Sequence, residues 1–175
     1  FGTGVFRFKP DASAMEFLQN TTNNTWGLGF SEEFDIHGST ANANPSFYLT
    51  FPRRHYEQAG LSKPRTPRAD DNPLFFPSST DIRQVDAHHR YTAAAGHAFY
   101  TSRRFPEIYW NNMAFICAPT GKLVGQWARH AKGAGFELQQ QPNNIYNSAD
   151  AWSGPVCAEV GPDGALWICD WYNIV

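Results

Sequence analysis

Short runs of apolar residues, separated by turns rich in Gly, Pro, Asn and Asp, recur along the 175-residue chain. Runs of this length that are bounded by turn residues are typical of β-strands, and two runs joined by a tight turn are typical of a hairpin. The pattern predicts antiparallel strands over the ranges 4–9, 14–18, 25–30, 35–40, 46–51, 96–100, 113–117, 122–129, 135–139, 155–160 and 165–168.

The clearest predicted hairpin lies near the end of the chain, where the turn Gly161-Pro162-Asp163-Gly164 joins the last two apolar runs. A Pro-Asp-Gly sequence is typical of a tight turn, in which we expect Gly164 to supply a positive φ. Asp170 and Tyr172 follow where the second strand ends. Polar side chains that emerge there from a buried strand are a first place to look for a binding site.

This hairpin belongs to a weak internal repeat over residues 26–42, 96–121 and 155–173. In each copy, a strand with small residues and an aromatic is followed by a turn and a second apolar strand that ends in polar residues. Repeated meanders of this kind build a β-propeller. We therefore predict an all-β fold, a partial β-propeller of two to three blades of four-stranded antiparallel meanders, with a β-sandwich as the alternative.

The periodic pattern breaks down from about residue 52 to residue 80, where Arg, Pro, Asp, Gly and Lys are frequent. We interpret this segment as a long surface loop within one propeller domain that spans residues 1–175, not as a domain boundary. A single helical turn is predicted within residues 103–110.

Composition adds limits on function. Sixteen acidic and fourteen basic residues give a net charge of -2, so no general field attracts nucleic acid or an anionic membrane. No apolar run approaches the ~20 residues that cross a bilayer, and we expect no transmembrane segment in this chain. The first residues lack the apolar core of a signal peptide and begin as if within a strand, which indicates a fragment of a longer protein.

The three cysteines, Cys117, Cys157 and Cys169, are far apart in the sequence and form no C-x-x-C, C-x-x-C-H or zinc-binding pattern. Each lies in an apolar run, so we expect buried free thiols and at most one disulfide. The sequence also lacks a G-x-S-x-G elbow, a phosphate-binding loop and an H-E-x-x-H helix, which argues against hydrolase, kinase and zincin functions.

Two longer stretches carry a family resemblance. Residues 91–124 contain Thr-Ala-Ala-Ala-Gly, Phe-Pro-Glu-Ile-Tyr and Met-Ala-Phe-Ile-Cys-Ala-Pro-Thr-Gly-Lys-Leu-Val, and residues 155–172 contain Gly-Pro-Asp-Gly-Ala-Leu-Trp-Ile-Cys-Asp-Trp-Tyr. Together they resemble the propeller domain of the membrane-bound dehydrogenases of planctomycetes and verrucomicrobia, a haem-binding group similar to glucose and sorbosone dehydrogenases. Ala94 and Ala95 stand where many relatives have Cys, and Trp171-Tyr172-Asn173 replaces the commoner Met-Tyr-Arg.

The resemblance implies an oxidoreductase that uses pyrroloquinoline quinone with Ca²⁺, oxidises a small sugar or alcohol and passes electrons to a cytochrome c domain or protein. It also implies a periplasmic or secreted protein, with membrane association as an option for the full-length chain. The C-x-x-C-H sequence that holds haem c is absent here. Any haem c would therefore belong to a cytochrome domain outside these residues.

A dehydrogenase of this kind needs a base that takes the proton of the substrate hydroxyl, and histidine suits this role because its pKa is near neutral. The candidates are His88, His89 and His97, with Asp86 to orient one of them. Arg90 is a candidate to bind a carboxylate of the quinone in a bidentate way. The alternatives are that the loop histidines are merely exposed to solvent and that His97 is a core residue.

Polar residues also follow two strands at their ends. Asn42 and Asn44 follow the strand that contains His37, and Asp170 and Tyr172 follow the last strand. If both are second strands of blades, these five residues occupy equivalent positions and could face one central funnel, where they would bind the cofactor. Their oxygens suit Ca²⁺, but no EF-type loop spaces them, and turn capping is the alternative.

Two functions follow from these observations. The first is the oxidoreductase described above, and the second is a non-catalytic propeller that binds a carbohydrate or a protein partner. The oxidoreductase hypothesis predicts that His37, His88, His97 and Asp170 converge in one funnel. Scatter of these side chains over different faces would argue against the enzyme and for the binding propeller.

Overall fold

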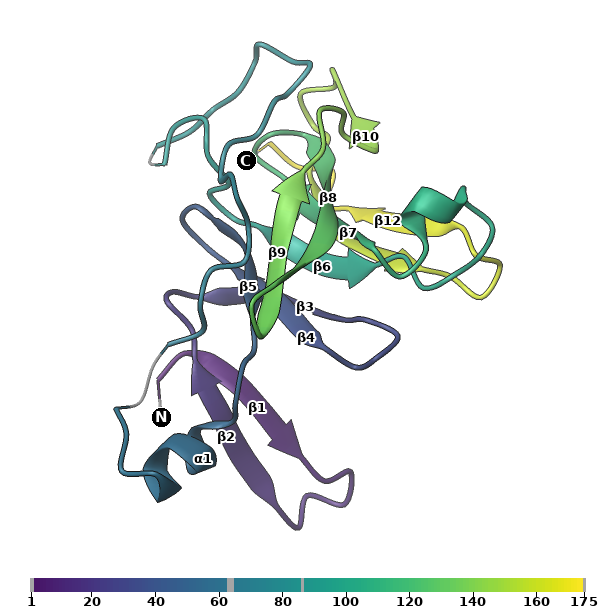
Figure 1. Ribbon diagram of the computed structural model, residues 1–175. Coiled ribbons are helices and arrows are strands. Elements are labelled where there is room, and N and C mark those ends of the chain that lie inside the picture. Colours follow the sequence, from purple (N-terminus) through teal and green to yellow (C-terminus); the bar gives the residue numbers. More distant parts are fainter. Residues whose placement is uncertain (1, 63–64, 86, 175) are drawn as a thin grey trace.

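The computed structural model describes residues 2–62, 65–85 and 87–174, and its regular structure is nearly all β (Figure 1). Its helical elements are α1 (Arg53–Gln58) and the 3₁₀ turn η1 (Glu107–Tyr109). The strands are β1 (Gly4–Phe8), β2 (Met15–Asn20), β3 (Thr25–Phe30), β4 (Ile36–Thr40), β5 (Asn44–Tyr48), β6 (Ala95–Phe99), β7 (Met113–Ala118), β8 (Leu123–Lys132), β9 (Gly135–Gln140), β10 (Tyr146–Asn147), β11 (Pro155–Val160) and β12 (Leu166–Asp170).

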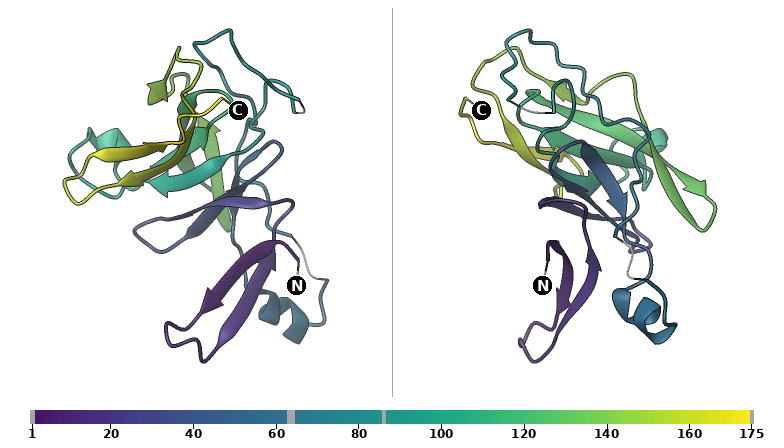
Figure 2. Two further views of the ribbon diagram at one scale, coloured as in Figure 1. Left: turned by 180° about the vertical axis from the view of Figure 1, so that it is seen from behind. Right: turned by 90° about the vertical axis from the view of Figure 1, so that its left-hand side faces the viewer.

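The sheets are antiparallel, and apart from the pairing of β8 with β10 their neighbouring strands are consecutive in the sequence. The sheets are the hairpin β1–β2, the three-stranded β3–β4–β5, the sheet β6–β7–β8 and the hairpin β11–β12. The long β8 pairs with β10 through Leu123 and Val124 and with β9 through residues 127–132. Figures 1 and 2 show the sheets in succession, from the purple hairpin β1–β2 to the yellow β11–β12. The predicted all-β fold with propeller-type blades is confirmed, but the described sheets have two, three or five strands and not the four that were predicted.

The first strands of three successive sheets, β3, β6 and β11, lie against one another, as the inner strands of propeller blades do. Glycines allow the close approach. A Cβ on Gly29 would lie against the carbonyl oxygen of His97 and 2.8 Å from its Nδ1, and a Cβ on Gly96 would lie 3.1 Å from Cα of Cys157. Gly96 also has a φ of +65°, which a side chain would strain.

Replacing Gly29 with Ala is expected to lower the free energy of unfolding by about 3 kcal/mol, because the new methyl group would force β3 away from the backbone of β6. Urea unfolding measures the loss. Gly2→Ala is the control, since its Cβ would meet only the side-chain amide of Asn20, at 3.1 Å. Equal stability of the two variants would show that β3 and β6 do not pack this closely.

Every residue of β7 is buried, because this strand has a hydrophobic layer on each face. Ala114, Ile116 and Ala118 face a cluster that includes Trp127, Tyr91 and Leu138. The alternate residues Met113, Phe115 and Cys117 face a second cluster, which includes Ala158 and the partly buried Leu166 and Ile168 of the hairpin β11–β12. The period-2 alternation thus places this sheet between two neighbours, as in a stack of blades.

The chain between β5 and β6 contains α1 and otherwise no helix or strand in the part that the structure describes. Isolated bridges tie this segment to the sheets, among them Asp70 with Leu138 and Ala93 with Ala41. The helix α1, which the sequence pattern did not indicate, has no buried residue. No helix of the described ranges is long and apolar enough to cross a bilayer.

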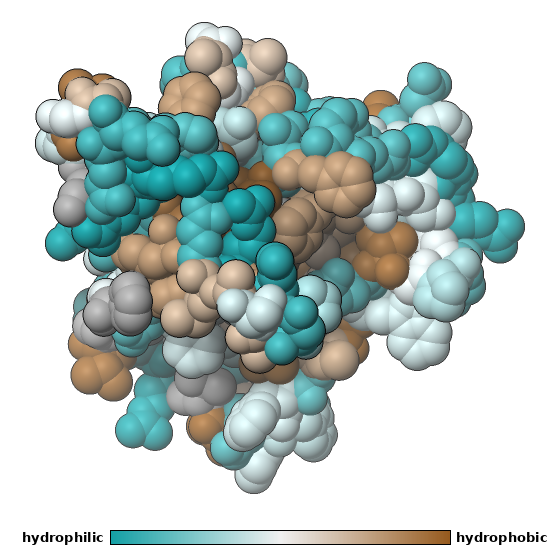
Figure 3. All heavy atoms as spheres, turned by 90° about the horizontal axis from the view of Figure 1, so that it is seen from below, coloured by the Kyte–Doolittle hydropathy of each residue, from teal (hydrophilic) through white to brown (hydrophobic). Residues whose placement is uncertain are grey.

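The cysteines are free thiols, as predicted, but only Cys117 is buried. Cys157 is partly exposed and Cys169 is exposed, because both lie on the face of the hairpin β11–β12 opposite to Ala158 and Ile168. The expectation of burial is wrong for Cys169. Other apolar side chains are exposed too, including Phe8, Met15 and Phe34, and Figure 3 shows apolar and hydrophilic surface interspersed on one face.

Candidate functional site

The β4–β5 turn and the segment that precedes β6 are far apart in the sequence but lie side by side in the structure. The backbone N–H of Asn42 donates to the carbonyl of Thr92 at 2.7 Å, and that of Ala43 donates to the carbonyl of Tyr91 at 2.7 Å. These bonds place the β4–β5 turn beside the segment that precedes β6. An open depression of about 400 Å³ results, lined by Asn42, Ala43, Ala87, His88 and Arg90.

The β4–β5 turn has the backbone that a two-residue hairpin loop requires. Asn42 and Ala43 have φ values of 58° and 65°, so both central residues are left-handed, as in a type I′ turn. Asn tolerates this conformation well, and its exposed side chain is directed out of the sheet at the depression. The amide of Asn42 can therefore donate to and accept from a ligand there.

Gln84 holds the loop that carries His88 and Arg90. Its Nε2 donates to the carbonyls of Ala87 and Arg90, at 3.2 and 2.9 Å, and to Oγ1 of Thr92 at 2.8 Å. Its Oε1 accepts the backbone N–H of His89 at 2.7 Å. Sequence reasoning missed this residue, since a single Gln in a loop forms no recognisable motif.

Replacing Gln84 with Ala is expected to accelerate tryptic cleavage after Arg90 at least about tenfold, because the loop loses several hydrogen bonds of about 1 kcal/mol each. Limited proteolysis followed by mass spectrometry measures the rate. Gln139→Ala, at an exposed position of β9, should leave the rate unchanged. Identical cleavage of both variants would contradict the role of Gln84.

His88 and Arg90 are both exposed at the depression. No described carboxylate forms an ion pair with Arg90, so its guanidinium is available for an anionic group. The imidazole of His88 is accessible to a substrate and to solvent. Asp86, predicted to orient a histidine, lies outside the described residues.

His37 and His97 lie away from the depression, in the buried layer between β4 and β6. Their rings are stacked with centroids 5.9 Å apart, and the side chains are 0% and 1% exposed. Nε2 of His97 is 3.0 Å from Oγ of Ser46, whereas neither ring nitrogen of His37 has a partner among the described residues. Neither histidine is placed to contact a ligand, so the alternative that His97 is a core residue describes it better.

Burial keeps both rings neutral. It lowers the pKa of His37 to about 2, with smaller contributions from His97 and the nearby Arg129, and it lowers the pKa of His97 to about 3. An unfolded histidine titrates near 6.5. As the pH falls below about 6.5, the unfolded state therefore binds protons that the folded state excludes.

We expect the free energy of unfolding to be fully retained above about pH 7 and to fall by up to about 2.7 kcal/mol per pH unit between about pH 6 and pH 4. Urea unfolding at a series of pH values measures the slope. His37→Phe, which fits the aromatic surroundings, should halve it, and His130→Gln, on an exposed part of β8, should not change it. An unchanged slope in His37→Phe would contradict the buried neutral pair.

Asn44 does not reach the depression. It is 5% exposed, and its amide Nδ2 donates to Oγ1 of Thr22 at 3.1 Å. The side chain thus ties β5 to the loop that precedes β3, which is a structural role.

Asp170 shapes the turn at the end of β12. Its Oδ1 accepts the backbone N–H groups of Gly154 and Tyr172 at 2.8 and 2.7 Å, and its Oδ2 accepts the hydroxyl of Ser153 at 2.8 Å. This is the turn capping considered as an alternative. Tyr172 is 62% exposed, and its ring centroid lies 6.2 Å from that of Trp152. Neither residue lines the depression, and the predicted convergence of His37, His88 and His97 with Asp170 does not occur.

The part of the chain that the structure describes contains no group of three or more His, Cys, Asp or Glu side chains placed to hold a metal ion. The oxygens of Asp170 are occupied by the donors just described. Asp170 is therefore engaged in the turn and is not free to bind Ca²⁺ as predicted.

A second concave surface, of about 370 Å³, is lined by the inner strands β3, β6 and β11. Leu28 and Phe30 come from β3, Ala98 from β6 and Glu159 from β11. Burial raises the pKa of Glu159. Glu159 is nevertheless exposed, so its carboxyl is a candidate hydrogen-bonding group for a ligand. The sequence analysis did not single it out, because a lone Glu within a strand forms no motif.

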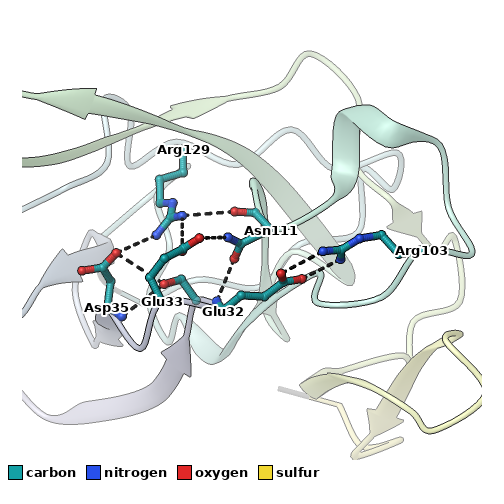
Figure 4. A network of polar contacts seen from close by, with 7 residues as sticks. Glu32, Glu33, Asp35, Arg103, Asn111 and Arg129 are labelled. Carbon is teal, nitrogen blue, oxygen red and sulfur yellow. Dashed lines mark hydrogen bonds and ion pairs between the residues drawn. The ribbon is translucent and has the colours of Figure 1, made fainter.

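A charged network lies at the β3–β4 turn, at the other end of β4 from the β4–β5 turn (Figure 4). Arg129 on β8 contacts Asp35 and Glu33 at 3.1 Å each and donates to the carbonyl of Asn111 at 3.2 Å. Hydrogen bonds from Asn111, and then from Arg129, lower the pKa of Glu33 to about 2. Because these carboxylates are already paired, the network joins the β3–β4 turn to the β6–β8 sheet and offers no free acid or base.

Solved structures share this fold. An oxidoreductase of Thermus thermophilus, described as a glucose dehydrogenase, superposes with a TM-score of 0.51 and 12% identity over 87% of this chain and 40% of that chain. Another glucose dehydrogenase structure has a TM-score of 0.50 and 17% identity over 92% of this chain and 45% of that one. At these identities the likeness shows the fold, and the chain spans less than half the length of either structure.

No curated protein of known function matches the chain significantly. The model of the family described as a domain of unknown function, DUF7133, matches residues 1–175, and the chain belongs to this family.

Proposed function

We propose that this chain is part of a sugar-dehydrogenase-like propeller oxidoreductase whose cofactor and substrate bind at the depression of Asn42, His88 and Arg90. One observation carries the proposal. Three residues with suitable chemistry, from two segments far apart in the sequence, line the same depression. The shared fold with glucose dehydrogenases supports the reaction class.

Arg90 would bind a carboxylate of pyrroloquinoline quinone, since its exposed guanidinium has no described carboxylate partner and guanidinium binds carboxylates bidentately. The volume of about 400 Å³ lies within the range of roughly 300–1,000 Å³ that small-molecule sites occupy. When bound, the quinone supplies the acceptor for the hydride of the substrate. No Ca²⁺ ligand is assigned among the described residues, because the oxygens of Asp170 already accept other donors.

His88 would take the proton of the substrate hydroxyl as the hydride leaves the carbon. Its exposure allows the substrate to reach the imidazole and lets the proton pass on to water. Asn42, fixed by the β4–β5 turn, would orient the sugar by hydrogen bonds to neighbouring hydroxyls. Gln84 would act as a positioning residue, since its contacts are with the backbone of the His88 loop.

Electron transfer to a cytochrome c domain or protein, and a periplasmic or secreted location, are further parts of the proposal. They rest on the resemblance of residues 91–124 and 155–172 to membrane-bound dehydrogenases. Haem c would belong to a domain beyond these residues.

A non-catalytic propeller that binds a carbohydrate or protein partner is the second candidate. The absence of His37, His97 and Asp170 from the depression favours it, because much of the expected catalytic set is missing there. In this case Asn42 and Arg90 would bind the ligand and no oxidation would follow.

Activity of the full-length protein decides between the two. After reconstitution with pyrroloquinoline quinone and Ca²⁺, the oxidoreductase should reduce an artificial dye with at least one member of a panel of aldoses and polyols. Without dye reduction, the oxidoreductase proposal fails. Saturable binding of a carbohydrate by calorimetry, without oxidation, would then favour the second function.

A further inference from the structure

A more enclosed pocket, separate from the depression, lies where the β7–β8 turn meets the segments that precede β6 and β11. Its volume is about 220 Å³. The polar residues that line it are Asp81, Arg83, Thr120, Lys122 and Ser153. Neither Asn42, His88 nor Arg90 lines this pocket, so it does not depend on the proposed oxidoreductase site.

Lys122 is a buried cation whose positive charge is only partly compensated by nearby acceptors. The residue is only 6% exposed, and its Nζ donates to the carbonyl oxygen of Asp81 at 2.5 Å. The carboxylate of Asp81 lies farther away, at 3.9 Å, and is 80% exposed. An ammonium group has three donors, and among the described residues only that carbonyl accepts from it. Because this distant, exposed carboxylate compensates the buried charge of Lys122 only weakly, the pocket favours an anion beside Lys122.

Two more groups in the pocket can bind an anion. Arg83 forms no ion pair with any residue that the structure describes. The hydroxyl of Thr120 forms no hydrogen bond with any of these residues. The hydroxyl of Ser153, by contrast, already donates to Asp170 and contacts Tyr146. Two cations and one carboxylate leave an excess positive charge in the lining.

We propose that this pocket binds a small anion through a carboxylate or phosphate group, with Lys122, Arg83 and Thr120 as its donors. The volume of about 220 Å³ falls below the roughly 300 Å³ of a drug-sized ligand site, so the ligand is smaller than a nucleotide or a quinone cofactor. Carboxylate and phosphate groups both present the charged oxygens that ammonium, guanidinium and hydroxyl donors bind.

Isothermal titration calorimetry of the full chain with sodium phosphate, and separately with sodium malonate, tests the proposal at constant ionic strength. Either anion should bind saturably with a Kd below about 10 mM and raise the melting temperature. Binding of malonate alone identifies a carboxylate site, and binding of phosphate alone a phosphate site. The absence of saturable binding of both anions overturns the proposal.

Variants locate the binding. Lys122→Met should weaken it at least tenfold, as expected for the loss of a charge-assisted hydrogen bond. Lys132→Met, at an exposed position of β8, is the matched control and should bind normally. If Lys122→Met does not fold, Arg83→Gln is tested instead, because Arg83 is exposed and its replacement should not disturb the fold. This variant should bind the anion several-fold more weakly. Unchanged affinity in each folded variant of Lys122 and Arg83 would overturn the proposed site.

Discussion

Replacing His88 with Gln is expected to lower kcat for dye-linked sugar oxidation by about 10²–10⁴-fold, because Gln can form hydrogen bonds but cannot take up the hydroxyl proton. The side chain is exposed at the depression, so the substitution should leave the fold intact. Steady-state kinetics of the reconstituted full-length enzyme measure the loss. The KM should change less than kcat, since the proton moves during the chemical step.

His130→Gln provides the matched control for this experiment. His130 is also exposed, but it lies on β8, opposite Glu137 of β9, and does not line the depression. Its replacement should not alter kcat. If His88→Gln and His130→Gln are equally active, His88 is not the base.

Replacing Arg129 with Met is expected to lower the free energy of unfolding by about 3 kcal/mol, because it leaves a partly buried carboxylate without its cation. The Arg129 side chain is 10% exposed and that of Asp35 is 25% exposed. Arg129 also lies over the ring of Phe136, with Cζ 4.6 Å from the centroid, a contact that the thioether of Met replaces only in part. Urea unfolding at neutral pH measures the change.

Arg103→Met tests the same network at a more exposed position. Arg103 pairs with Glu32, and its side chain is 51% exposed. Such pairs contribute about 0.2–1 kcal/mol, so this variant should be only slightly destabilised. A loss for Arg129→Met as small as that for Arg103→Met would mean that the network does not hold the two sheets together.

Local sequence was sufficient to predict the longer strands, because most contain apolar residues in short runs that end at turn residues. The turn at Gly164 has the expected positive φ of 77°, and the helical turn predicted near residue 108 is η1. Strand β10 was missed because its two residues pair only with the first residues of β8. The helix α1 was missed because it buries no residue and so has no apolar face to recognise.

The candidate site was predictable only in part. Asn42, His88 and Arg90 lie in loops, where polar side chains reach solvent whatever the neighbouring sheets do. His37 and His97 lie in strands, and their burial depends on the packing of one blade against the next, which the sequence does not reveal. The roles of Gln84 and Lys122 likewise depend on contacts with backbone groups several residues away or in another segment.

The proposed binding site is the depression at Asn42, His88 and Arg90, and hydrogen–deuterium exchange tests this proposal without an activity assay. The full-length protein is compared with and without pyrroloquinoline quinone, and the exchange of each peptide is followed by mass spectrometry. We predict that the quinone slows exchange in peptides covering residues 41–43 and 87–92, but not in those covering β9. Protection confined to other parts of the chain, or no protection at all, would contradict the claim.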